Sequence, residues 1–286
     1  MLNLAVGVAV GFLAGRATWL AARPWFNQPA LARPNYRGRF IPVGVGLVVP
    51  IALFLVEAGR AVAGAAGVGE HPGISGARVL TIVAACGFCL LGAIDDVAGS
   101  GEYRGFRGHI LALAAGHVTT GLFKLLGGGV VALVVVAPIA GDSLGRLLAD
   151  ASLVALAANL GNLLDRAPGR TTKASVAAFA VLAVAAGVRP ALSGVAVVIG
   201  AGAALLRDDL HERLMLGDAG ANALGAALGL GVVMATGTGV RTVVLIVVAV
   251  LNALGEVVSF TKVIDAVPPL RALDQMGRRA SAASHG

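Results

Sequence analysis

Three polar residues recur at every third position near the end of an apolar run: Asn159, Asn162 and Asp165. Residues three apart lie one above another on a helix, so these side chains form a polar stripe about 120° wide. Two amides and a carboxylate are hard oxygen donors, suited to Mg²⁺ and to ligands that carry phosphate or hydroxyl groups. A stripe that only holds neighbouring helices together has the same pattern, so the stripe by itself favours neither interpretation.

Two adjacent carboxylates, Asp95 and Asp96, end another apolar run. Neighbouring side chains on a helix diverge by about 100°. One of the two could therefore face a metal while the other holds a basic group or takes a proton. The alternative is a simple polar stop at the end of a membrane helix.

A third cluster, over residues 216–222, places Asp218 between glycines at the start of an apolar run. The dipole of a helix stabilises an anionic charge at its N-terminus, and glycines allow a ligand to approach the backbone closely. A carboxylate that only caps the helix would look similar.

Basic residues follow the Asp95-Asp96 pair along the chain. Arg104, Arg107 and His109 lie on a segment that contains glycines, and Lys124 comes further on. These residue types bind phosphate groups. At an inner membrane face they would also attract anionic lipid without any specific function.

The composition is that of a membrane protein: 286 residues, 57% hydrophobic and 13% charged, with a mean hydropathy of +0.87. Its apolar runs of about 16–20 residues are long enough to cross a bilayer as helices. We predict an all-α integral membrane protein, with a polytopic domain over residues 1–260 and a basic cytoplasmic tail over 261–286. The net charge of +7 lies mostly in loops, where it indicates orientation rather than nucleic-acid binding.

About nine transmembrane helices are predicted, with the N-terminus outside and the C-terminus in the cytoplasm. If residues 108–138 held two spans, Asp95-Asp96 and Asp165 would lie on opposite faces of the membrane. One span, preceded by a half-inserted or cytoplasmic helix over 109–124, puts them on the same face. The predicted spans are 2–22, 41–56, 79–94, 125–138, 150–164, 175–188, 191–206, 219–235 and 242–260.

Charge along the chain supports this version. The predicted inner loops and tail hold 15 of the 22 lysines and arginines, as expected for cytoplasmic segments. Asp95, Asp96, Asp165 and Asp218 all fall where a span meets the cytoplasm. Carboxylates gathered in this way repel one another unless a cation is present, so the pattern favours a divalent-metal site.

The order Asp-Asp, then Asn-x-x-Asn-x-x-Asp, then Gly-Asp-x-Gly resembles the polyprenyl-phosphate N-acetylhexosamine-1-phosphate transferases. That family includes the phospho-N-acetylmuramoyl-pentapeptide transferases and the N-acetylglucosamine-1-phosphate transferases. The resemblance covers roughly residues 41–260. It implies an enzyme of the bacterial inner membrane that transfers a sugar 1-phosphate from a nucleotide (UDP) sugar to a polyprenyl phosphate and releases UMP, with a homodimer left open.

The resemblance also implies roles for individual residues. Asn162 and Asp218 would ligate Mg²⁺, with Mn²⁺ as an alternative ion. Asp95 and Asp96 would be the essential carboxylate pair, one of which deprotonates the lipid phosphate. The remaining members of the stripe, Asn159 and Asp165, would order the site around the nucleotide.

The sequence departs from the family pattern in three places. Pro168 stands where a fourth acid often follows, Met215 replaces an aromatic residue, and the tail lacks the histidine-rich loop of the pentapeptide transferases. Arg271 or Arg278 is a candidate to replace the missing cation at the diphosphate. A catalytically reduced family member, acting as a membrane scaffold or lipid-binding partner, is therefore the second hypothesis. A small-ion transporter is less favoured, because its charges should lie near the bilayer midplane.

Overall fold

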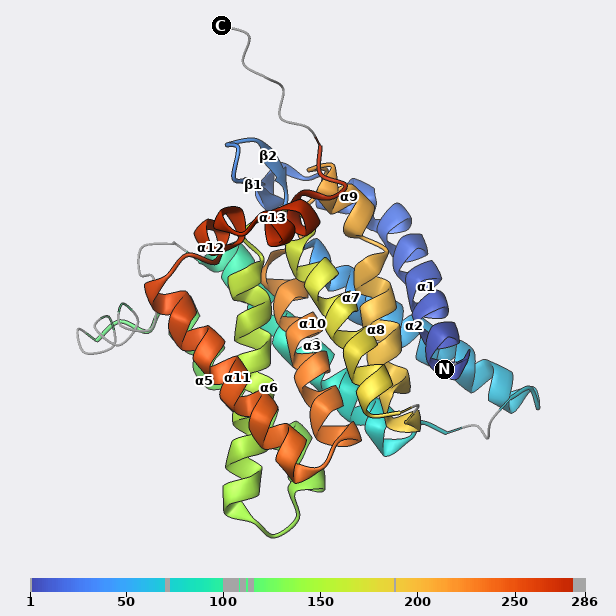
Figure 1. Cartoon of the computed structure of the whole chain (residues 1–286). Helices are drawn as coiled ribbons and strands as arrows, with labels where there is room; N and C mark the ends of the chain where they lie inside the picture. Colours follow the sequence, from blue (N-terminus) through green and yellow to red (C-terminus); the bar gives the residue numbers. More distant parts are fainter. Residues whose placement is uncertain are drawn as a thin grey trace, which may run out of the picture.

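The computed structural model of the chain describes residues 2–69, 73–99, 108, 112, 116–187 and 189–279. It is a bundle of long helices, capped at one end by a small hairpin and short helices (Figure 1). The long helices are α1 (Leu2–Phe26), α2 (Val48–Ala65), α3 (Gly76–Ala98), α5 (Thr120–Ala140), α6 (Leu144–Leu164), α7 (Arg170–Ala185), α8 (Ser193–Ala203), α10 (Gly217–Ala235) and α11 (Thr238–Val257). The structure confirms the predicted all-α multi-pass membrane fold.

In the described part of the chain, eight helical segments are long and apolar enough to cross a membrane. Helix α8 reaches this length only as part of the continuous segment Pro190–Leu210. Helix α7 falls short of it, since its 16 residues span about 24 Å. Figure 1 shows that α1 begins at one end of the bundle and α11 finishes at the other. The nine spans predicted from the sequence are one more than these eight segments, and the additional one, over 175–188, corresponds to α7.

Three segments differ from the prediction. The helix α5 begins at Thr120, so Lys124 lies in its first turns rather than on a separate helix over 109–124. Residues 109–111 and 113–115 of that predicted helix fall outside the described residues. The segment predicted as a basic loop contains the antiparallel strands β1 (Ala32–Pro34) and β2 (Phe40–Pro42). The predicted polar tail contains α12 (Phe260–Ala266) and α13 (Pro268–Gln275).

One acid, Glu212, makes several contacts with the turn of the hairpin. Glu212, which follows the short helix α9 (Leu206–Leu210), accepts hydrogen bonds from Asn35 Nδ2 (3.0 Å) and Tyr36 Oη (3.2 Å). It also forms an ion pair with Arg37 (3.2 Å). The turn of the hairpin is thereby fixed above the same end of the bundle that carries α9, α12 and α13 (Figure 1).

Helix α10 is the centre of the bundle, where it packs against α3 and α6. Glycines let the backbones come close enough for this packing. A Cβ on Gly92 of α3 would lie 2.3 Å from the Asp218 carbonyl oxygen, and one on Gly161 of α6 would lie 2.4 Å from that of Ala221. In the 3₁₀ turn Val45–Leu47, a Cβ on Gly46 would lie 2.1 Å from Gly220. The first turns of α10 are therefore enclosed by the elements that carry the predicted motifs.

The opposite end of the bundle carries two buried acids. Glu57 on α2 pairs with Arg60 (2.6 Å) and with Arg78 on α3 (3.2 Å). Asp150 on α6, whose side chain is fully buried, pairs with Arg146 and with Arg241 on α11 (3.0 Å). Four arginines at this end thus share two acids, and each acid bridges an arginine of its own helix and one of another helix.

The close approach of α3 and α10 makes a test of the packing possible. We expect Gly92→Ala to lower the stability by at least about 2 kcal/mol, because backbone atoms would have to move to admit the methyl group. The measurement is thermal unfolding in detergent. Gly129→Ala on α5 is the control, since a Cβ there meets nothing within 4 Å. Equal unfolding temperatures for the two variants would contradict the packing of α3 on α10.

Candidate functional site

The three predicted motifs meet at one end of the bundle. Asp95-Asp96 lies at the C-terminal end of α3, Asp165 directly follows α6, and Asp218 lies in the first turn of α10. All three helix ends point to the side that carries the hairpin, α12 and α13 (Figure 1). The prediction that these acids share one face therefore agrees with the structure.

Lys124 joins two of these motifs. Its Nζ donates to Asp95 Oδ2 at 2.8 Å and also to Asp218 Oδ2. The side chains are largely enclosed, with 17% of Lys124, 20% of Asp95 and 25% of Asp218 exposed. One ammonium thus bridges carboxylates that are more than 120 residues apart along the chain.

Asp96 has a different partner from its neighbour. Its carboxylate accepts from the backbone N–H groups of Asp218 (2.9 Å) and Ala219 (3.0 Å), the first residues of α10. This is the role of an N-cap side chain, supplied here by another helix. Gly217 has φ of +72°, and a Cβ there would lie 2.5 Å from Asp96 Oδ2. The two adjacent carboxylates diverge as predicted, with Asp96 bound to the backbone and Asp95 to the lysine.

Asp165 is partly buried where α6 ends. Burial raises the pKa of this carboxyl well above its usual value, and the charges of Asp209 and Asp218 add to the effect, with a smaller contribution from Asp96. The hydroxyl group of Thr171 acts in the opposite direction by a hydrogen bond to the carboxylate. Asp165 therefore belongs electrostatically to the same site as the Asp95-Asp96 and Asp218 motifs.

Asp209 is a site residue that the sequence reasoning did not select. It lies on α9, is 6% exposed, and accepts a hydrogen bond from the backbone N–H of Gly169 at 2.9 Å. Gly169 directly precedes α7, so Asp209 holds the start of α7 as Asp96 holds the start of α10. The signal was present in the sequence, because Asp208-Asp209 is a second adjacent pair of acids at the end of an apolar run.

The residues of the polar stripe on α6, Asn159 and Asn162, make different contacts. Asn159 Nδ2 donates to Oδ1 of Asn252 on α11 at 2.6 Å, and Asn252 Nδ2 in turn donates to the carbonyls of Leu156 (3.0 Å) and Val248 (2.8 Å). Asn159 thus acts in the structure as a contact between helices. Asn162 is half-buried one turn further on, and its carbonyl accepts from the Asp165 backbone N–H at 3.0 Å. Its predicted role as a metal ligand stays a prediction, as does substrate binding by Asn159.

The predicted basic residues are spread over several places. Arg104, Arg107 and His109 lie outside the described residues. Arg271 is exposed on α13. Arg278 pairs with Asp274 (2.6 Å) and donates to the Pro168 carbonyl oxygen (3.0 Å). Lys124 is thus the predicted basic residue that the described structure brings against the acids.

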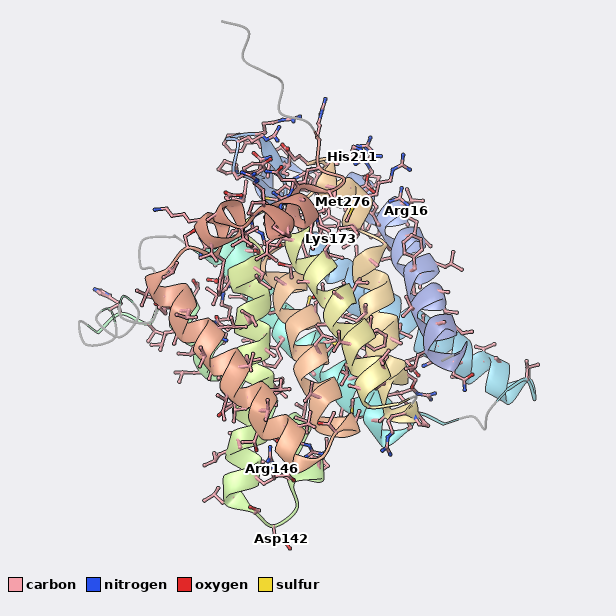
Figure 2. All side chains as sticks on the ribbon, viewed as in Figure 1. Arg16, Asp142, Arg146, Lys173, His211 and Met276 are labelled. Atoms are coloured by element: carbon pink, nitrogen blue, oxygen red, sulfur yellow. The ribbon has the colours of Figure 1, made fainter. Side chains whose placement is uncertain are left out.

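The C-terminal helices are fastened to the start of α7. Arg170 donates to both oxygens of Asp274, at 2.8 Å and 3.0 Å. Burial raises the pKa of Asp274, but the opposing effect of Arg170 and Arg278 is larger and holds the pKa below its usual value. Lys173 donates to the carbonyls of Leu273, Asp274 and Met276, and Figure 2 shows Lys173 and Met276 close together at this end of the bundle.

A cleft of about 260 Å³ opens beside the end of α6. It lies between α6 and the junction of α11 with α12, and its lining includes Leu163, Arg166, Ser259 and Phe260. The cleft therefore combines apolar side chains with a guanidinium and a hydroxyl group. It adjoins Asp165 along the chain, since Arg166 is the next residue.

The donor set can be compared with what Mg²⁺ requires. Within the described residues, there is no group of three or more histidines, cysteines or acids that could hold a metal ion. Asp95 and Asp218 nevertheless direct one oxygen each at a single cationic atom, the Nζ of Lys124. Hard carboxylate oxygens at a partly hydrated site suit Mg²⁺, which keeps several waters as ligands. The residues therefore fit the ion in donor type. The residue that shares a cation with Asp218 in the structure is Asp95, whereas the sequence predicted Asn162.

The structure separates the roles of the two adjacent acids. We expect Asp96→Asn to lower the stability by about 1–3 kcal/mol, because the amide can place an N–H group against the backbone donors of α10. Thermal unfolding in detergent measures the effect. Asp95→Asn, which leaves this cap intact, is the matched control. If both variants unfolded at the same temperature, Asp96 would not be the cap of α10.

Docking of the C-terminal helices can be tested by proteolysis. We expect Asp274→Ala to leave the buried Arg170 without its partner, at a cost of about 3–5 kcal/mol. Trypsin should then cleave after Arg271 much faster than in the unsubstituted protein. Asp265→Ala, at an exposed acid of α12, should leave the cleavage rate unchanged. Equal cleavage of the two variants would mean that Asp274 does not hold α13 in place.

Comparison with known proteins adds no family to this description. The chain matches no model of a known protein family and no curated protein.

Proposed function

We propose that the protein is a membrane-bound transferase that moves a hexosamine 1-phosphate from a UDP-sugar to a polyprenyl phosphate and releases UMP. The observation that carries the proposal is the convergence of Asp95 and Asp218 on the ammonium of Lys124. Asp165 lies electrostatically close to them. Phosphoryl transfer needs charge neutralisation and alignment of the reacting groups more than covalent chemistry, and a cluster of opposite charges supplies both.

Each residue has a task in this proposal. Asp95 and Asp218 would hold the magnesium ion, with Asn162 as a further oxygen donor from α6. The ion would neutralise the diphosphate of the sugar donor. Lys124 would bind a phosphate group of a substrate. Asp165, whose pKa is raised, is suited to take a proton from the lipid phosphate and to release it again.

The location of the cluster suits two substrates of unlike solubility. A polyprenyl phosphate reaches the site through the bilayer, whereas a nucleotide sugar arrives from water, so the chemistry must occur where the two media meet. The acids lie at the ends of helices rather than at their middles. We assign this end of the bundle to the cytoplasmic face of a bacterial inner membrane. The cleft beside α6 would be an access route to the acids. The protein would then be an enzyme of cell-envelope glycan synthesis.

A second function is favoured by a specific observation. Asp96, Asn159 and Asp209 all serve as structural partners of other helices. Arg278, a candidate for the missing cation, fastens the C-terminal segment. These contacts are what a catalytically reduced relative would keep if it acted as a membrane scaffold or lipid-binding partner. Asp95 and Asp96 are used differently, and this difference favours the enzyme. Among the described residues, the Asp95 carboxylate bonds a lysine, whereas that of Asp96 caps a helix backbone.

The transferase hypothesis predicts a product that can be isolated. Purified protein with Mg²⁺, undecaprenyl phosphate and a panel of radiolabelled nucleotide sugars should form a labelled lipid with at least one donor. Asp95→Asn should lower its turnover by about 100-fold or more, since a charge at the reacting groups is lost. Asp265→Asn, at an exposed acid, is the control and should keep full turnover.

The same experiment separates the two functions. Absence of labelled lipid with every donor, together with full cellular function of Asp218→Ala, would exclude the enzyme and leave the scaffold. A labelled lipid that persists undiminished in Asp95→Asn would place the catalytic centre elsewhere.

A further inference from the structure

We propose that Lys124 is an exchangeable counter-ion: its ammonium and a divalent metal ion compete for the oxygens of Asp95 and Asp218. In the absence of metal the ammonium holds the two carboxylates together. Binding of the metal displaces the ammonium and frees it for an anionic substrate group. The inference rests on the proposed function, because it concerns the order of events at the same site.

The geometry places the ammonium where a metal would bind. Lys124 Nζ is bonded to one oxygen of Asp95, from α3, and to one oxygen of Asp218, from α10. The positions of both carboxylates are set by close packing, since a Cβ on Gly92 of α3 would lie 2.3 Å from the Asp218 carbonyl oxygen. The two oxygens are therefore held on either side of one point, and that point is occupied by a positive charge.

A single lysine does not balance the local charge. Asp95, Asp96 and Asp218 lie in direct contact with Lys124 or with the first turn of α10. One ammonium among several carboxylates leaves an excess of negative charge, which lowers the free energy of any additional cation bound there. The lysine thus links the two carboxylates but does not balance the negative charge around them.

The two cations cannot use the same oxygens together. Mg²⁺ binds carboxylate oxygen at about 2.0–2.1 Å and requires nearly octahedral geometry. An ammonium at 2.8 Å from the same oxygen would lie within a few ångströms of the metal, where the two positive charges repel. Lysine can leave, because its charge is a compact group on a flexible stem of four carbons.

An unpaired amide lies on the side of Asp218 that faces the interior. Asn222 follows Asp218 by four residues on α10, so the two side chains project from the same face of the helix. It is 3% exposed, and its Nδ2 is buried without a hydrogen-bond partner among the described residues. Buried polar groups of this kind are normally satisfied by protein, water or a ligand, so this N–H donor, one helical turn from Asp218, is expected to bond an oxygen atom of a water or of a ligand.

Metal affinity provides the first test. Mn²⁺, titrated by electron paramagnetic resonance into the purified protein in detergent, should bind about tenfold or more tightly to Lys124→Met than to the unsubstituted protein, because the competing ammonium is gone. Lys173→Met is the matched control, since this lysine binds carbonyls of α13 and not the acids. Equal or weaker Mn²⁺ binding in Lys124→Met would overturn the proposal.

Amine labelling provides a second test that needs no substitution. The chain has three lysines, and they differ in surroundings: Lys262 is exposed, Lys173 binds carbonyl oxygens, and Lys124 bridges the carboxylates. An amine-acylating reagent, with labelled peptides quantified by mass spectrometry, should modify Lys124 several-fold faster when Mg²⁺ is present. Lys262 and Lys173 should be unaffected. Labelling of Lys124 that is unchanged or slower with Mg²⁺ would contradict the exchange.

The outcomes separate this inference from the proposed function. Formation of the lipid product without any effect of Mg²⁺ on Lys124 labelling would refute the exchange and leave the transferase intact. Mn²⁺ binding with faster Lys124 labelling, but no product with any donor, would refute the transferase and leave an exchangeable metal site.

Discussion

Two hydrogen bonds from the first turn of α10 to Asp96 fix the geometry on which the whole site depends. A membrane helix that starts inside a bundle has backbone N–H groups with no intrahelical partner, and they must be satisfied locally. Asp96 satisfies two of them from α3. This contact sets the rotation of α3 against α10, and the rotation determines that Asp95 faces Lys124. Of the two adjacent acids, Asp96 therefore stabilises the fold, whereas Asp95 is left to face the candidate site.

Other polar groups in the bundle also find their partners on neighbouring helices. Asn159 and Asn252 satisfy each other between α6 and α11, and Asp209 accepts from the residue that precedes α7. Each of these groups stabilises a helix contact at a position where the sequence alone indicates a possible ligand. What distinguishes Asp95 and Asp218 is that their partner is a mobile side chain rather than a backbone group. A contact to the backbone is part of the fold, whereas a contact to a lysine can be exchanged.

Much of the architecture was predictable, because it follows from lengths and charges that the sequence displays. Runs of apolar residues gave the spans, and alternation of the spans placed Asp95, Asp165 and Asp218 at one end. The partners were not predictable in the same way. Whether Asp95 or Asp96 faces the site depends on a rotation of about 100°, which the packing at Gly92 and the cap by Asp96 set together. Asn252 was missed because a lone amide in an apolar run has no local pattern. The fastening of the C-terminal segment by Asp274 joins residues about 100 positions apart, and such pairings leave no periodicity to detect.

The acids at the opposite end have a consequence for how the chain enters the membrane. Glu57 and Asp150 each pair first with an arginine of their own helix, three or four residues away, and then with one from a later helix. The local pair can form as soon as its helix does, so Arg60 and Arg146 need not cross the bilayer as uncompensated charges. The second carboxylate oxygen of each acid then remains as an acceptor for the later helix. Glu57 pairs with Arg78 once α3 has emerged from the ribosome, and Asp150 pairs with Arg241 once α11 has emerged. Biosynthesis in order from the N-terminus would therefore complete each of these clusters by recruiting the later helix to the earlier one.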